Sequence, residues 1–370
     1  MPRIAYFIDS PTYGGGEAVL ISLCKGVREQ GFDPIVFLFE NTQLEAKCRE
    51  ENIIYKRAPE FIAFKSIKSI HKFGTAFANV LKEYKTDLLH SHLFGAIIAG
   101  SISARLAFIP DIATIHDSYT IEERFARIRL LQFAVLSGTK VITVCKHIEN
   151  FLHRHAWFVD ENLKTIYNGV DLPELDPIIR TKIRSELQLS EDEVAITSVG
   201  RLVELKRFER LIRSFQPLKE KYKTKLFIIG DGPERDNLNT LINDLRLSDH
   251  VKLLGFREKV SEYLQASDIF TLVSRTEGFS CSVLEAQASA LPCVVTNVGG
   301  NRELVTDNES GIIIKSDTLS QITSSLETLL DDQSKRKEMG KVGRARALKH
   351  FAKEVMIRDY IQSYNDILKR

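Results

Sequence analysis

The chain has 370 residues, 44% of them hydrophobic and 27% charged, so it is long enough for two globular domains with a core each. Basic and acidic residues nearly balance, and the formal charge of +2 excludes the strongly basic surface with which proteins grip nucleic acid. The five cysteines are scattered without a CxxC pair, which argues against a disulfide framework or a zinc site and favours a cytoplasmic protein with reduced thiols.

The first half alternates short apolar runs with longer helical patterns, which predicts a parallel α/β sheet. A helix is expected at 17–30, where Val19, Leu23 and Val27 fall on one face that should pack on the sheet. The first residues lack the basic and apolar regions of a secretory signal, and no apolar run approaches the roughly 20 residues of a membrane-spanning helix. Any membrane contact is therefore expected to be peripheral. The predicted strands of this half are 4–8, 35–39, 87–90, 112–116 and 141–145.

Two prolines and several acidic residues interrupt this pattern at 170–177, and a second series of strands and helices follows. We therefore expect an N-terminal domain over 1–172, a second domain over 178–350, and a C-terminal helix over 351–370 that packs back toward the first. Both domains should be doubly wound α/β units of the Rossmann type, facing each other across a cleft that binds ligands at the carboxyl ends of the strands. The strands predicted in the second domain are 194–199, 225–229, 250–254, 269–273, 293–296 and 311–314.

Two glutamates, Glu277 and Glu285, flank the sequence GFSCSVL between a predicted strand and a predicted helix. The free N–H groups near Ser280 to Ser282 would form an anion site at the start of that helix, where a diphosphate fits. A carboxylate beside it could then bind sugar or ribose hydroxyls. The alternative is that one glutamate caps the helix and the other is merely solvated.

Two cations follow another predicted strand: Arg201 comes directly after Gly200, and Lys206 follows five residues later. A hydrogen bond to a charged group contributes roughly 1.5 to 3 kcal/mol. An arginine and a lysine that converge on one diphosphate would therefore supply much of a micromolar affinity. A solvated surface charge is the commoner role for either residue, and only their shared place after a strand favours binding. The turn at 255–257, including Arg257, ends a further strand and is well placed for a nucleobase.

In the first domain a run of three glycines at 14–16 joins the first strand to the first helix, where it would let a phosphate approach the helix terminus. His116 ends one predicted strand, and His90 and His92 end the strand before it. No cysteine pair or HExxH motif accompanies these histidines. Polar positions in a cleft or core are therefore a better interpretation than a metal site.

Together these motifs resemble those of glycosyltransferase family 4, whose members have the GT-B fold of two Rossmann-like domains. The resemblance covers residues 1 to about 350 and is most specific where the glutamate motif is combined with the upstream cations. It implies retaining transfer of a sugar from a nucleotide-diphosphate sugar, with no essential metal ion and no further cofactor. The motifs are GGGE at 14–17, TIHD at 114–117, NGVD at 168–171, GR at 200–201 with Lys206, GDGP at 230–233, EGFSCSVLE at 277–285 and GGNRE at 299–303.

The resemblance also implies roles for single residues of the second domain. Arg201 and Lys206 would neutralise the diphosphate leaving group. Glu285 would bind the ribose hydroxyls, and Glu277 would contact the donor sugar. The pocket for sugar and phosphate would be lined by the backbone of Gly278, Phe279 and Ser280.

From the first domain, His116 would face the reacting sugar, while Gly15 and Gly16 would close on the phosphates. No protein base is assigned, because in members of the family the departing phosphate assists deprotonation of the acceptor. Family frequency favours a UDP-hexose or UDP-N-acetylhexosamine donor, with GDP-mannose next. The implied acceptor is a glycan or a lipid-linked sugar in cell-surface polysaccharide or lipopolysaccharide synthesis. Two alternatives stay open: a nucleotide-sugar epimerase of the same fold, and a non-catalytic nucleotide-sugar-binding scaffold.

The segment 61–85 places lysines among phenylalanines and isoleucines. One interpretation is a basic amphipathic surface, with Lys65, Lys68 and Lys72, that holds the protein at an anionic membrane, here the cytoplasmic face of the inner membrane. The other is an ordinary surface helix whose apolar face packs on the sheet.

Overall fold

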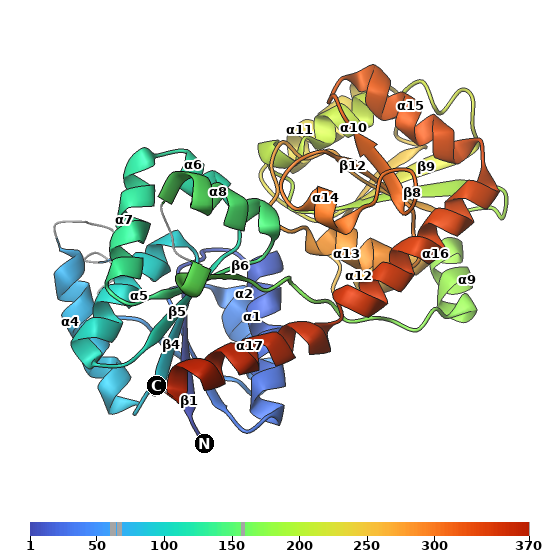
Figure 1. Ribbon diagram of the computed structural model, residues 1–370. Coiled ribbons are helices and arrows are strands. Elements are labelled where there is room, and N and C mark those ends of the chain that lie inside the picture. The colour runs from blue at the N-terminus through green and yellow to red at the C-terminus, as the bar shows by residue number, and fades with distance from the viewer. Residues whose placement is uncertain (60–63, 65–68, 157–159, 370) are drawn as a thin grey trace. The chain divides into compact units, whose positions relative to one another are not determined.

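The computed structural model describes residues 1–59, 64, 69–156 and 160–369, and these form two compact units (Figure 1). Unit 1 comprises Met1–Gly169 and Lys353–Arg370, and unit 2 comprises Val170–Ala352. Each unit is built on one parallel sheet flanked by helices. The predicted α/β fold with two Rossmann-like units is therefore confirmed.

The sheet of unit 1 has the strand order β3-β2-β1-β4-β5-β6-β7 among the residues that the structure describes. The chain starts at β1 inside the sheet, runs out to the edge strand β3, and returns to lay β4 on the other side of β1. Connections on the two sides of β1 diverge, which opens a crevice at the carboxyl ends of β1 and β4. The strands are β1 Arg3–Ile8, β2 Asp33–Leu38, β3 Ile54–Arg57, β4 Leu88–His92, β5 Asp111–Ile115, β6 Lys140–Thr143 and β7 Leu163–Thr165.

Aromatic side chains fill one face of this sheet. Phe7 of β1 packs against Phe73 and Phe77, with ring centroids 5.6 and 4.8 Å apart. The first helix, α1, buries Val19, Leu23 and Val27 as predicted. The helices of unit 1 are α1 Gly15–Glu29, α2 Thr42–Glu50, α4 Ile70–Glu83, α5 Phe94–Ala107, α6 Tyr119–Glu122, α7 Phe125–Leu136, α8 Lys146–Ala156, the 3-10 turn η1 Asp160–Asn162, and α17 Lys353–Leu368.

Helix α17 belongs to unit 1 although it comes from the far end of the chain (Figure 1). Its Tyr360 and Tyr364 are fully buried, and the Tyr364 hydroxyl lies 3.1 Å from the hydroxyl of Tyr6 in β1. Helix α1 approaches it closely at Gly26, because a Cβ at that position would lie 2.2 Å from Cδ1 of Ile357. The C-terminal segment is thus part of the core of unit 1.

Only part of the basic segment 61–85 lies within the described residues, and Lys65 and Lys68 lie outside them. In α4, Phe73 and Phe77 are buried in the core, whereas Lys72 is exposed. The described part therefore agrees with a surface helix whose apolar face packs on the sheet. In the described ranges, no helix combines the length and the apolar character needed to cross a bilayer.

The sheet of unit 2 has the order β10-β9-β8-β11-β12-β13. Here β8 is central, and the chain switches sides between β10 and β11. The loops after β8 and β11 therefore leave from neighbouring strands at the same edge. The strands are β8 Val194–Val199, β9 Thr224–Ile229, β10 Val251–Gly255, β11 Ile269–Leu272, β12 Cys293–Thr296 and β13 Gly311–Ile314.

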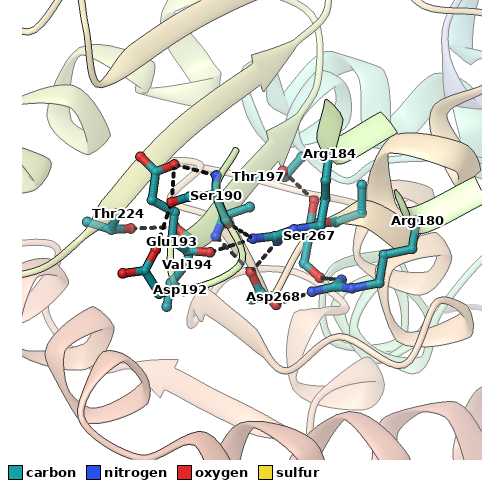
Figure 2. A network of polar contacts seen from close by, with 12 residues as sticks. Arg180, Arg184, Ser190, Asp192, Glu193, Val194, Thr197, Thr224, Ser267 and Asp268 are labelled. Atoms are coloured by element: carbon teal, nitrogen blue, oxygen red, sulfur yellow. Dashed lines mark hydrogen bonds and ion pairs between the residues drawn. The ribbon is translucent and has the colours of Figure 1, made fainter. Parts of the chain in front are cut away.

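A polar network holds the first helix of unit 2, α9, at the end of this sheet where the strands begin (Figure 2). Arg180 and Arg184 donate to the carboxylate of Asp268 at 2.7 and 3.1 Å, and the N–H of Ala195 donates to it at 2.8 Å. Asp268 thus joins α9 to the starts of β8 and β11. The helices of unit 2 are α9 Pro177–Glu186, the 3-10 turn η2 Glu204–Lys206, α10 Phe208–Phe215, α11 Arg235–Asp244, α12 Val260–Ala266, α13 Cys281–Ala288, α14 Asn301–Leu304, α15 Leu319–Leu330 and α16 Gln333–His350.

Candidate active site

In unit 2 an ion pair joins the loops that follow β8 and β11. Lys206, in η2, places its Nζ 2.5 Å from Oε1 of Glu277, and these side chains are only 22% and 9% exposed. The two loops are also joined through their backbones, because the N–H of Arg275 donates to the carbonyl of Leu205 at 2.8 Å. Two residues predicted for the same site, 71 positions apart in the sequence, therefore lie in direct contact.

Glycine turns hold these loops close together. Gly299 has φ +52°, and a Cβ there would lie 1.8 Å from the carbonyl oxygen of Glu277. The next residue, Gly300, donates its N–H to the carbonyl of Gly278 at 2.7 Å. Gly230 lies equally close to the β8 loop, since its Cβ would be 2.0 Å from the carbonyl oxygen of Gly200. The GDGP and GGNRE turns thus support the loops that carry Lys206 and Glu277.

Helix α13 begins directly after the Glu277 loop, with Ser280 as its N-cap residue. The Ser280 side chain does not cap the helix, and its hydroxyl lies 3.1 Å from that of Ser282. Phe279 is buried and packs its ring against Phe351 at 5.5 Å. The N–H groups of the first turn, which have no partner within a helix, consequently lie next to Glu277 and can receive an anion.

Glu285 lies one turn further along α13 and is half-buried. Burial, together with the smaller effect of the negative charge of Asp171, raises the pKa of its carboxyl from 4.5 to about 7. Near neutral pH the group is therefore divided between a carboxylate and a protonated acid. The first accepts hydrogen bonds from hydroxyls, and the second can also donate one.

The two remaining cations of the predicted set lie differently. Arg201 is exposed in the loop after β8, close in sequence to Lys206. Arg257 follows the edge strand β10, two strands away from β8, and its Cζ lies 5.7 Å from the ring centroid of Tyr263. Arg257 is therefore not part of the Lys206 and Glu277 cluster.

In unit 1, polar side chains gather at the carboxyl ends of β1, β4 and β5. His92 ends β4, and its Nδ1 lies 2.9 Å from Nε2 of His116, which follows β5. A Cβ at Gly16 would lie 3.8 Å from Cγ and Nδ1 of His116, so the glycine backbone lies over that ring. The structure thus brings two predicted residues, Gly16 and His116, together with His92.

Burial governs the charge of these groups. It lowers the pKa of His116 to about 4, although the charge of Asp117 acts in the opposite direction. It also holds the pKa of His92 well below the ordinary value of 6.5. Both imidazoles are consequently neutral at physiological pH.

Sequence reasoning missed Asp9, which follows β1 directly. Burial raises the pKa of its carboxyl to about 6, and one of its oxygens, Oδ1, is buried without a hydrogen-bond partner among the described residues. Ile8 pairs with His92 across the sheet, so Asp9 lies at the same edge as the histidines. A polar residue immediately after a buried strand was the available signal.

The glutamate of the GGGE motif has a structural role. Its Oε2 accepts a hydrogen bond from the N–H of Gly14 at 2.7 Å, and the Glu17 side chain is buried. This is the glutamate half of a capping box at the start of α1, because the N-cap residue Gly14 has no side chain to make the reciprocal bond. A phosphate near Gly15 and Gly16 would therefore approach a helix terminus that already has a carboxylate close by.

The described residues contain no group of three histidine, cysteine, aspartate or glutamate side chains arranged to hold a metal ion.

Two family models match the chain. The model described as "Glycosyltransferase Family 4" matches residues 13–174, and the model described as "Glycosyl transferases group 1" matches residues 179–346. N-acetyl-alpha-D-glucosaminyl L-malate synthase of Bacillus anthracis is 25% identical over 97% of this chain and 96% of its own length. UDP-Gal:alpha-D-GlcNAc-diphosphoundecaprenol alpha-1,3-galactosyltransferase of Escherichia coli is 29% identical over 73% of this chain and 71% of its own.

Among solved structures, Anabaena HepE in complex with UDP and glucose has a similar fold. The TM-score is 0.87 over 99% of this chain and 100% of that one, at 21% sequence identity. A likeness at this identity shows the shared architecture, which is the GT-B fold.

Proposed function

Because the chain belongs to the group 1 and family 4 glycosyltransferases, and is thus a glycosyltransferase, we propose that it transfers a hexosyl or N-acetylhexosaminyl group from a nucleotide-diphosphate sugar with retention of configuration. The observation that carries this proposal is the contact of Lys206 with Glu277 beside the first turn of α13. It combines a cation for a diphosphate, a carboxylate for a sugar, and N–H groups for phosphate oxygens.

In this proposal, Lys206 and Arg201 neutralise the diphosphate as it leaves. Glu277, one oxygen of which is paired with Lys206, turns its second oxygen to the donor sugar. Glu285 binds the ribose hydroxyls, and its mixed protonation suits a partner that both donates and accepts. The site acts by positioning and by stabilising negative charge on the leaving group.

The proposed reaction needs no protein base. The bond between the anomeric carbon and the diphosphate oxygen breaks, and its electrons stay on the diphosphate. The acceptor oxygen forms the new bond on the same face of that carbon, and its proton passes to the departing phosphate. His116 of unit 1 then serves as a hydrogen-bonding group for the sugar, because burial keeps its imidazole neutral.

For the donor we propose a UDP-sugar, with GDP-mannose as the second candidate. The galactosyltransferase relative is named for UDP-Gal, and the HepE structure contains UDP and glucose. A thermal-shift screen of UDP, GDP, ADP, CDP and their sugars, with and without EDTA, tests this, since a ligand of the native state raises the melting temperature. A selective, EDTA-insensitive shift supports the proposal, and no shift with any of these nucleotides would contradict it.

For the acceptor we propose a lipid-linked sugar at an anionic membrane surface, reached through helix α7. Its Phe125, Phe133 and Leu136 are 65, 64 and 86% exposed and lie on one stripe with Arg129, whose Cζ is 5.5 Å from the centroid of the Phe125 ring. The segments 70–85, 94–107 and 119–136 carry seven lysines and arginines against three glutamates, a net charge of +4 in a chain whose total is +2. Exposed rings beside cations suit the headgroup region of a bilayer.

Cosedimentation with phosphatidylglycerol vesicles tests this surface. The double variant Phe125→Ser, Phe133→Ser should lose binding, whereas Phe256→Ser, which changes a ring of unit 2 that is 53% exposed, should not. If the unaltered protein leaves the vesicles unbound, the acceptor is a water-soluble one, of the kind that the malate synthase relative is named for.

A further inference from the structure

The proton between His92 and His116 is shared in a definite way. Their rings come from neighbouring strands, stack at 24° with centroids 5.2 Å apart, and join Nδ1 of His92 to Nε2 of His116 at 2.9 Å. Both imidazoles are neutral, so each carries one proton. One of the two joined nitrogens must therefore donate and the other accept.

The second nitrogen of His92 indicates which one donates. His92 is fully buried, and its Nε2 has no hydrogen-bond partner in the described part of the chain. A buried N–H without an acceptor is costlier and rarer than a buried lone pair without a donor. The proton of His92 therefore belongs on Nδ1, from which it is donated to Nε2 of His116.

This arrangement leaves the proton of His116 on its Nδ1. Among the described residues no group forms a hydrogen bond with that nitrogen, and it is not one of the atoms closed off from solvent. The neighbouring backbone at Gly16 carries no side chain that would cover the ring. His116 thus presents an N–H donor at the carboxyl edge of the sheet.

A second layer holds His92 in place. The ring of His90 lies 4.2 Å from that of His92, and both of its nitrogens are engaged: Nδ1 with the Tyr364 hydroxyl and Nε2 with the Thr114 hydroxyl, each at 2.7 Å. His90 therefore cannot compete for the Nδ1 proton of His92. The plane of the His92 ring is fixed by a neighbour that makes no hydrogen bond to it.

We propose that His92 is a positioning residue, which fixes His116 as the Nδ1–H tautomer and so makes it a hydrogen-bond donor to an oxygen of the bound sugar. This rests on the role proposed above for His116. It means that His116 cannot take a proton from the acceptor through Nδ1, since that nitrogen already carries one. The same logic applies to metal-bound histidines, whose second nitrogen is set by an outer partner.

Two-bond proton–nitrogen NMR of the full chain tests the tautomer without any substrate, with His116→Asn used to assign the signals. Protonated Nδ1 and bare Nε2 are expected for His116, and the opposite pattern would overturn the proposal. His92→Leu should release the tautomer. His92→Gln, whose amide N–H can still donate to Nε2 of His116, should largely retain it. Tyr364→Phe removes a hydroxyl that contacts His90 and Tyr6 and forms no hydrogen bond with His92 or His116, so it should leave the His116 signals unchanged.

Kinetics with the donor identified in the thermal-shift screen supply the second readout. His92→Leu should lower kcat about ten-fold, the effect of losing one well-placed hydrogen bond, with KM for the donor within about two-fold. His92→Gln should restore most of the rate. Equal losses in both variants, together with weaker nucleotide binding and a lower melting temperature, would make His92 a structural residue and refute the proposal. If no nucleotide binds the unaltered protein while the Nδ1–H tautomer is observed, the proposed function fails and the tautomer assignment stands.

Discussion

Replacing Lys206 by methionine removes the cation of the candidate site while keeping an unbranched side chain of similar reach. In the native protein the lysine lies 2.5 Å from a Glu277 carboxylate that is only 9% exposed. A hydrogen bond to a charged group contributes roughly 1.5 to 3 kcal/mol. At about 1.4 kcal/mol per factor of ten, that range corresponds to a change of about 10- to 150-fold in an equilibrium or rate constant.

We expect nucleotide affinity, measured by calorimetry, and kcat/KM to fall together by such a factor in Lys206→Met, because the cation contacts the diphosphate in both ground and transition states. The variant should also lose stability, since it leaves the buried Glu277 carboxylate without its partner. The double variant Lys206→Met, Glu277→Gln removes that charge. It should therefore recover much of the melting temperature and none of the affinity.

The two readouts separate a ligand-binding lysine from a structural one. If Lys206→Met lowered the melting temperature and left nucleotide affinity and kcat/KM unchanged, the ion pair would serve only to join the two loops. The assignment of the diphosphate to this edge of unit 2 would then be wrong.

Three further changes have expected outcomes. Gly299→Ala should unfold unit 2 or destabilise it by about 3 kcal/mol or more, because its Cβ would lie 1.8 Å from a carbonyl oxygen. A midpoint of urea unfolding equal to that of the native protein would contradict this. Gly16→Ala places a methyl at ordinary contact distance, 3.8 Å from the His116 ring, so the melting temperature should stay that of the native protein. KM for the donor should rise, and an unchanged KM would contradict a ligand beside Gly16. Glu285 has a pKa of about 7 in the folded state against an ordinary 4.5, so its contribution to stability is complete below about pH 4.5 and is lost as the pH rises to about 7. In urea unfolding, Glu285→Gln should gain stability relative to the native protein between pH 5 and pH 7.5, and a constant difference would contradict the raised pKa.

The sheets could be predicted because most strands are continuous apolar runs that parallel sheets bury on both faces. Two strands, β3 and β7, were not predicted from the sequence, for a physical reason. β3, Ile54–Arg57, is an edge strand with exposed Lys56 and Arg57, and β7, Leu163–Thr165, has three residues. Neither is long or apolar enough for its pattern to stand out from a loop.

The individual residues of the candidate site could be predicted from the sequence, but the contacts between them could not. The residues of the Lys206 and Glu277 pair follow strands β8 and β11, whose adjacency depends on a crossover that no local pattern encodes. The contact of His90 with Tyr364 spans 274 positions. The helical pattern near Tyr364 gives a buried face, but it does not reveal which group the buried hydroxyl contacts.

The return of the chain into unit 1 has a consequence for its synthesis. Tyr360 and Tyr364 reach the core beside β1 and β4 only after the 183 residues of unit 2 have been made, so unit 1 cannot complete its fold first, as N-terminal domains usually do. Until then, His90 has the Thr114 hydroxyl as a partner but lacks that of Tyr364, and the face of α1 around Gly26 lies uncovered. A fragment that stops at Gly169 would stay in that unfinished state, whereas unit 2 is one continuous stretch of chain whose core does not wait for a later segment.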